Sequence, residues 1–107
     1  MCSLRLLVFP FLVWAGVASP QDLPGDPEAG GKLAREVCAA CHIVSADQTD
    51  DPGTPAPTFF SVAADPSVTA LSLRVFFRTP HAQMPDLTLT PDETDNIIAY
   101  ILTLKED

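Results

Sequence analysis

Apolar residues recur with helical spacing in three segments of this chain. In residues 30–37 they fall at i, i+3, i+4 and i+7, which places one apolar stripe along a helix. Asp26 and Pro27 stand just before this stripe, where a carboxylate caps free backbone N–H groups and proline suits the first helical position. The pattern predicts a helix that begins at Pro27 and runs directly into Cys38. Its buried stripe is Gly30, Leu33, Ala34 and Val37.

Two further stripes follow in the second half of the chain. Asp65 and Pro66 repeat the cap-and-proline signal, and they predict a helix that ends before Pro80. The clearest helix start lies at Thr90, because proline follows it and Glu93 completes a capping box. The stripe of the earlier helix is Val68, Leu71, Val75 and Phe76. The stripe of the later one is Ile97, Tyr100, Ile101 and Leu104, widened by Ile98 and Leu102.

The segments between the stripes predict loops and one short helical piece. Residues 45–56 are polar and contain two turn-forming sites. Residues 58–63 fit one or two helical turns that carry Phe59 and Val62 inward. No segment shows a convincing strand pattern, and the chain contains no repeat. The sequence therefore predicts one all-α domain with three main helices, a short helical turn and long loops.

Residues 1–18 have the composition of a leader rather than of a domain. Arg5 precedes an apolar run that continues to Ala18, and small residues at positions 16 and 18 fit recognition by signal peptidase. We expect cleavage after Ala18 and a periplasmic domain of residues 19–107. An uncleaved anchor is the alternative. The run is shorter than the ~20 residues of a spanning helix and Pro10 interrupts it, so we expect no stable membrane insertion.

The charge of residues 19–107 is strongly acidic. All 14 Asp and Glu residues lie there against five Lys and Arg residues, which gives a net charge of −9. This charge opposes binding to nucleic acid and anionic lipid, and it favours a protein partner with a basic docking patch. Solubility is the alternative explanation of the charge. We expect a monomer.

The chemistry of the chain is concentrated in Cys38-Ala39-Ala40-Cys41-His42, the attachment motif. Two thiols three residues apart, followed by an imidazole, are the signature of a covalently attached haem c. Each cysteine forms a thioether with one vinyl edge of the porphyrin, and the histidine is the proximal ligand of the iron. A redox dithiol is the alternative, but its thioredoxin-like fold requires strands. Zinc would need a fourth ligand, and the chain has no second cysteine pair.

Met84 is the predicted sixth ligand of the iron, by elimination. Met1 leaves with the leader, so Met84 is the only thioether of the mature chain. Two predicted helical segments separate it from His42, enough chain to reach the other face of the haem, and Pro85 keeps the local backbone extended. The alternative sixth ligand is His81 or a lysine. The alternative role of Met84 is to fill a gap in the core. Filled axial positions exclude small ligands and favour one-electron transfer over catalysis, so we do not expect an enzyme.

With these residues in place, the chain resembles the class I cytochromes c, the small monohaem carriers of bacterial periplasms and mitochondria. The resemblance covers nearly all of residues 26–105. It rests on the attachment motif and on Gly30, Leu33, Ala34, Ala56-Pro57-Thr58-Phe59, Met84-Pro85, Leu89-Thr90, Glu93, Ile97, Ala99-Tyr100-Ile101 and Leu104.

This resemblance implies a class I cytochrome c fold wrapped around one covalent haem. It implies that Gly30 lets the N-terminal helix cross the C-terminal helix beside Tyr100. It also implies that the Pro57 carbonyl accepts a hydrogen bond from the ring of His42 and fixes its orientation.

The implied function is a periplasmic electron carrier, and the alternative is a haem c subunit held permanently in a dehydrogenase or oxidase complex. The family often has a ring of lysines around the haem edge, whereas this chain has only two lysines. That departure favours redox partners of opposite charge. Arg74 and Arg78 are candidates either for pairing with a haem propionate or for a solvated helix face.

Overall fold

Four helices occur within residues 7, 9–13, 15–16, 23–84 and 87–105, which the computed structural model describes. They are α1 (Pro27–Val37), α2 (Phe59–Ala64), α3 (Ala70–Arg78) and α4 (Pro91–Thr103). These described residues form no sheet, and their only β pairing is an isolated bridge. The all-α architecture with one short helix is therefore confirmed. No helix in the described part is long and apolar enough to cross a membrane, and the predicted cleavage site at Ala18 lies outside it.

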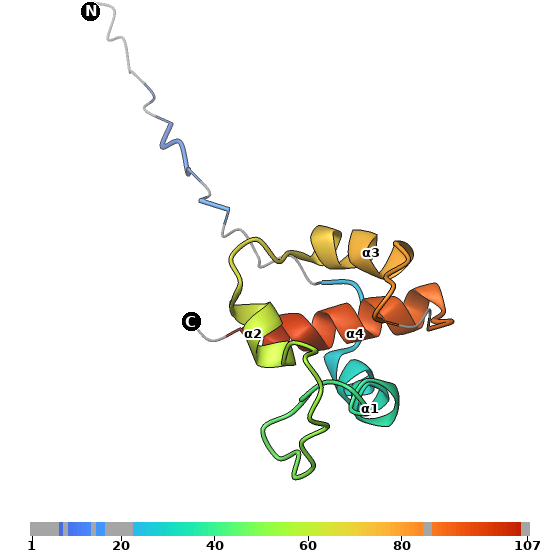
Figure 1. Ribbon diagram of the computed structural model, residues 1–107. Coiled ribbons are helices and arrows are strands. Elements are labelled where there is room, and N and C mark those ends of the chain that lie inside the picture. Colours follow the sequence, from blue (N-terminus) through green and yellow to red (C-terminus); the bar gives the residue numbers. More distant parts are fainter. Residues whose placement is uncertain (1–6, 8, 14, 17–22, 85–86, 106–107) are drawn as a thin grey trace, which may run out of the picture.

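Helix α4 is the element on which the others pack. In Figure 1 it runs between α3 and α1, with α2 near its C-terminal end, and α1, α2 and α3 all contact it. Its start is the predicted one, because Thr90 and Glu93 form a reciprocal capping box and Pro91 occupies the first turn. The start of α1 is also confirmed, since the side chain of Asp26 accepts hydrogen bonds from the first turn. Local capping chemistry thus sets both helix starts.

Two glycines let α1 approach α4 closely. A Cβ atom at Gly30 would overlap the backbone carbonyl of Asn96 in α4. A Cβ atom at Gly31 would lie 2.9 Å from Cε2 of Tyr100. The expected crossing is therefore present, with Gly30 against the α4 backbone and Gly31 against the tyrosine ring. Glycine inside a helix costs about 1 kcal/mol relative to alanine, and the close packing offsets that cost.

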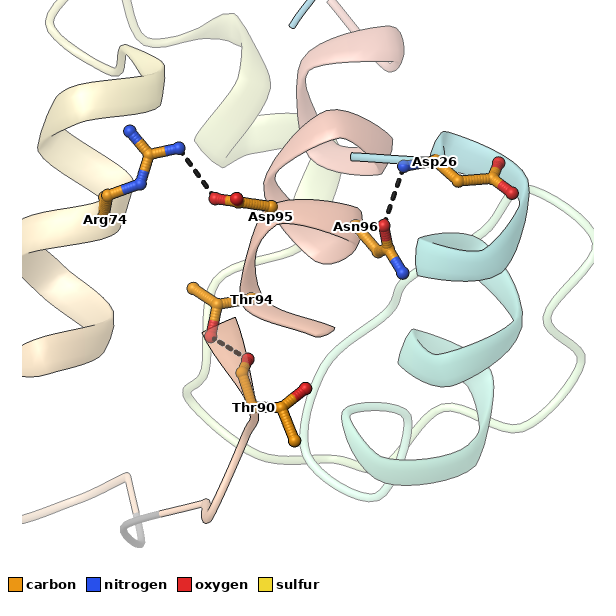
Figure 2. Close-up of polar contacts among 6 residues, drawn as sticks. All are labelled: Asp26, Arg74, Thr90, Thr94, Asp95 and Asn96. Carbon is orange, nitrogen blue, oxygen red and sulfur yellow. Dashed lines mark hydrogen bonds and ion pairs between the residues drawn. The ribbon is translucent and has the colours of Figure 1, made fainter. Parts of the chain in front are cut away.

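Neighbouring polar residues of α4 hold the helices on either side (Figure 2). The backbone N–H of Asp26 donates to Oδ1 of Asn96 over 2.7 Å and fixes the entry to α1. On the other side, Arg74 of α3 forms an ion pair with Asp95 over 2.7 Å, and both side chains are 28% exposed. Consecutive residues near the start of α4 therefore orient α1 and α3.

Of the stripe predicted for α3, Val68 packs against the core, whereas the rest of the stripe is wrong. Leu71 and Val75 are 68% and 56% exposed, whereas Leu73 is buried and Phe77 packs against the core. The helix is capped by Thr69, and Asp65 instead ends α2 and accepts hydrogen bonds from Ser67. More than one face of this helix carries apolar residues, and packing against α4 buries the face with Leu73 and Phe77.

The core lies where α1, α2 and α4 meet the loop that follows the attachment motif. Ile97, Ile98 and Val44 are its largest fully buried side chains. Phe59 of α2 is buried as predicted, while Val62 is only partly buried against the core. Val37, expected in the stripe of α1, is instead 38% exposed. The core thus reaches to within two residues of His42.

Candidate functional site

The attachment motif continues directly from the C-terminus of α1. The N–H of Cys38 donates to the carbonyl of Ala34 over 2.8 Å and closes the last turn of the helix. The N–H groups of Cys41 and His42 then donate to the carbonyl of Cys38 over 3.1 Å and 2.9 Å. The motif is therefore a tight turn in which the carbonyl of Cys38 accepts from both Cys41 and His42.

The two cysteines are free thiols in different surroundings. Cys38 is 5% exposed and belongs to the core, whereas Cys41 is exposed. Burial raises the pKa of the Cys38 thiol to about 11. A redox dithiol needs a thiolate at neutral pH, and a raised pKa opposes its formation. Burial therefore opposes formation of the thiolate at Cys38, whereas Cys41 is accessible from solvent.

The ring of His42 is oriented by a backbone carbonyl. Its Nδ1 atom lies 2.6 Å from the carbonyl oxygen of Pro57. A carbonyl only accepts, so Nδ1 carries the proton and donates, which leaves the lone pair of Nε2 free for a metal. The ring of Phe59 packs beside the imidazole at a centroid distance of 5.4 Å. The Pro57 contact that the resemblance implied is thus present in the structure.

The loop of residues 43–57 makes two contacts with the motif that the sequence did not predict. The side chain of Gln48 bonds to the backbone of His42 and Val44. The hydroxyl of Thr54 donates to the carbonyl of Cys41. No sequence signal marks them, because polar residues in a polar loop are typical of solvent contact.

Tyr100 fixes the same loop from α4. Its hydroxyl donates to the carbonyl of Val44 over 2.6 Å, and its ring packs beside Phe59 at a centroid distance of 6.4 Å. Burial raises the pKa of Tyr100 above its ordinary value, which keeps the phenol in its protonated, donating form. The loop after the motif is therefore anchored to the core.

Met84 lies in a different part of the described structure, beyond the end of α3. Its N–H donates to the carbonyl of His81 over 3.3 Å, and its side chain is half-buried. A small cavity of about 30 Å³ lies beside it, lined by Phe76, Phe77, Thr79, Pro80, His81, Met84 and Leu87. None of the hydrogen bonds within the described residues joins this turn to the attachment motif. Pro85, which was expected to extend the backbone here, lies outside the described residues.

His81 is engaged with the end of α3. Its ring stacks on Phe76 at a centroid distance of 3.9 Å and an interplanar angle of 20°. Its Nε2 atom lies 3.2 Å from the carbonyl oxygen of Phe76, to which it donates. The same carbonyl also accepts from the backbone N–H of Thr79 over 3.1 Å. The ring therefore adds a second donor and a stacking contact at the end of α3.

The two arginines proposed for propionate pairing also differ. Arg74 is paired with Asp95 of α4, so its guanidinium is already engaged in holding the helices together. Arg78 is exposed in the last turn of α3. Arg78 thus stays a candidate for either predicted role, a partner of a haem propionate or a residue of a solvated helix face.

The donor set fits a covalently attached haem. Two free thiols lie one turn apart, and an imidazole whose Nδ1 atom is bonded to the Pro57 carbonyl follows at once. When bound, the haem supplies an iron that exchanges one electron between its ferrous and ferric states.

Comparison with known proteins agrees with this donor set. The family model for cytochrome c matches residues 27–105. The chain is 35% identical over 88 residues to cytochrome c-552 of Bradyrhizobium diazoefficiens (strain USDA 110), a match that covers 82% of this chain and 84% of that protein. No solved structure matches the chain. The matched residues include the whole attachment motif, so the chain belongs to the cytochrome c family of electron carriers, with haem c bound covalently through Cys38 and Cys41.

Proposed function

We propose that the chain is a periplasmic one-electron carrier, exported by a leader of residues 1–18, with a mature domain of residues 19–107. We further propose that His42 and Met84 are the axial ligands of its haem iron. The single observation that carries the proposal is the hydrogen bond from His42 Nδ1 to the Pro57 carbonyl over 2.6 Å. It fixes the tautomer that coordinates through Nε2 and increases the basicity of the ring.

His42 binds one face of the iron in this proposal. The residue directly follows Cys41, so the thioether at that cysteine keeps the imidazole at the haem. Pro57 restrains rotation of the ring through its carbonyl, and Phe59 packs beside it. Held in this way, the ligand needs little rearrangement when the charge of the iron changes, which favours fast electron exchange.

Met84 binds the other face in this proposal. The structure supports it over His81, whose ring is stacked on Phe76 and bonded to its carbonyl. To ligate the iron, His81 would have to give up both contacts. A thioether favours ferrous iron, so Met84 raises the reduction potential relative to a second imidazole.

The proposed partners are redox proteins with a basic docking patch, and the proposed state in solution is a monomer. The support is the net charge of −9 on residues 19–107. A haem c subunit held in a dehydrogenase or oxidase complex is the second candidate, favoured by the small number of lysines. Co-purification with a complex at high salt favours the subunit, because ions screen a transient charged contact.

The test is expression of the full chain together with haem-maturation machinery. We expect a c-type absorption spectrum and a haem that acid-acetone does not extract. The ferric protein should show the weak long-wavelength charge-transfer band of methionine ligation, and Met84→Ala should abolish it. Extractable haem would refute covalent attachment, and a band that survives in Met84→Ala would refute this ligand. Recovery of the protein in the periplasmic fraction without residues 1–18 tests export.

A further inference from the structure

We propose that Gln48 is a positioning residue for the haem ligand His42, because its side-chain amide ties the backbone of His42 and Val44 to the loop that orients the imidazole. The role rests on the proposed ligation of iron by His42. Gln48 lies in the polar loop of residues 43–57, six residues after the ligand.

The amide of Gln48 uses its oxygen and both of its N–H groups. Its Oε1 atom accepts from the N–H of Val44 over 2.9 Å. Its Nε2 atom donates to the carbonyl of His42 over 3.1 Å and to the carbonyl of Asp50 over 3.0 Å. A backbone N–H only donates and a carbonyl only accepts, so these partners also determine which end of the amide is oxygen. The half-buried side chain thus has a single defined orientation.

These contacts hold the ligand from two sides. Gln48 bonds to the carbonyl of His42, and Pro57, from the same loop, bonds to its ring. The hydroxyl of Thr54 holds the preceding residue, Cys41, at its carbonyl. A change in the path of the loop therefore moves the acceptor of the His42 ring proton.

Gln48 also links this loop to the rigid core. Val44, whose N–H it binds, is fully buried. The carbonyl of the same residue accepts the hydroxyl of Tyr100 in α4. Val44 is thus fixed at both its N–H and its carbonyl by side chains. Through this residue, Gln48 connects the ligand to the helix core.

The experiment uses the holoprotein and the variants Gln48→Ala and Gln48→Met. Methionine keeps the length of the side chain but forms none of the three hydrogen bonds, so agreement between the variants separates hydrogen bonding from lost packing. The first readout is solvent exchange of the His42 ring N–H in the ferrous protein, measured by NMR. We expect exchange at least about fivefold faster in both variants, the factor that corresponds to one net hydrogen bond.

The second and third readouts report the state of the ligand itself. The proton shifts of the ferric haem methyl groups depend on the plane of the axial imidazole, and we expect them to change in both variants. The reduction potential should rise, because a weaker hydrogen bond to Pro57 makes the imidazole a poorer donor to ferric iron. Should Gln48→Ala fail to mature, Gln48→Met provides the same readouts.

Two control variants separate an effect on the position of His42 from a general loss of stability. Thr49→Ala alters an exposed neighbour in the same loop and should leave all three readouts unchanged. Arg74→Ala breaks the α3–α4 ion pair. It should lower the free energy of unfolding and leave the three readouts unchanged. Wild-type readouts in both Gln48 variants, or an equal change in Arg74→Ala, would overturn the proposal. If the wild-type protein itself shows no histidine-ligated haem, the proposed ligation fails instead.

Discussion

Replacing Gly30 with alanine tests the close crossing of α1 and α4. The new Cβ atom would overlap the backbone carbonyl of Asn96, which cannot turn aside as a side chain does. Overpacking costs about 1–3 kcal/mol or more, and a rigid backbone obstacle places this site at or above the upper end. Alanine has a better helix propensity than glycine, which stabilises α1 by about 1 kcal/mol and offsets part of this cost. We therefore expect the free energy of unfolding to fall by about 2 kcal/mol or more.

The assay is thermal unfolding of the holoprotein, followed by far-UV circular dichroism. For a domain of this size, about 2 kcal/mol corresponds to a fall in Tm of roughly 8–16 °C. Gly31→Ala is the matched control, because its Cβ atom would meet a side chain, the ring of Tyr100 at 2.9 Å, rather than backbone, so a smaller shift relieves the overlap. We expect this control to lie within about 1 kcal/mol of the wild type, since the gain in propensity offsets the contact. A Gly30→Ala protein as stable as the wild type, or less affected than Gly31→Ala, would refute the reasoning.

Three further predictions concern the ligands, the α3–α4 contact and the tyrosine. His81→Phe should keep the methionine charge-transfer band and the stack on α3, whereas a wild-type protein without the band, whose axial ligation changes in His81→Phe and not in Met84→Ala, would favour His81 over Met84 as the ligand. Arg74→Ala should lower the free energy of unfolding by about 0.5–1 kcal/mol in urea titrations, and by less in high salt, which screens the partly exposed pair; an equal loss in both salts would contradict an ionic contribution. Tyr100→Phe removes one hydrogen bond and should cost about 1 kcal/mol near neutral pH. The raised pKa of the tyrosine means that the folded state binds its proton more tightly, so wild-type stability should be complete below the ordinary tyrosine pKa and fall as pH rises through the raised value. Urea titrations across this range should show a flatter profile for Tyr100→Phe, and identical profiles would contradict this assignment.

The sequence predicts best where the determinants are local. The helix starts at Pro27 and Pro91 follow from caps within a few residues, and the structure has both helices there. The attachment motif is equally local, because its cysteines and histidine are adjacent in the chain. The all-α class follows from the same local patterns.

The predictions fail where one segment has two acceptable solutions. Helix α3 has apolar residues on more than one face, so its pattern fits either a stripe through Leu71 and Val75 or one through Leu73 and Phe77. Only packing against α4 decides between them. The N-cap at Thr69 could not be predicted either, because Asp65 has an equally good capping signal four residues earlier.

The contacts of Gln48 and Thr54 could not be predicted, because they depend on the folded path of a loop. A polar side chain in a polar loop has no periodicity that shows what it faces. The role of Arg74 was likewise open, because its partner Asp95 lies 21 residues away. Such long-range polar contacts follow from the fold and are not encoded in any short pattern.

The contact between Asp26 and Asn96 joins residues that are 70 positions apart, and it has a consequence for the order of events in the cell. The first and last described helices pack on each other, so the core cannot close until α4 has been synthesised. Until then, Cys38 lacks the neighbours that bury it in the finished domain. Burial of the Cys38 thiol is therefore a late event in folding, because it depends on contacts made by the last described helix.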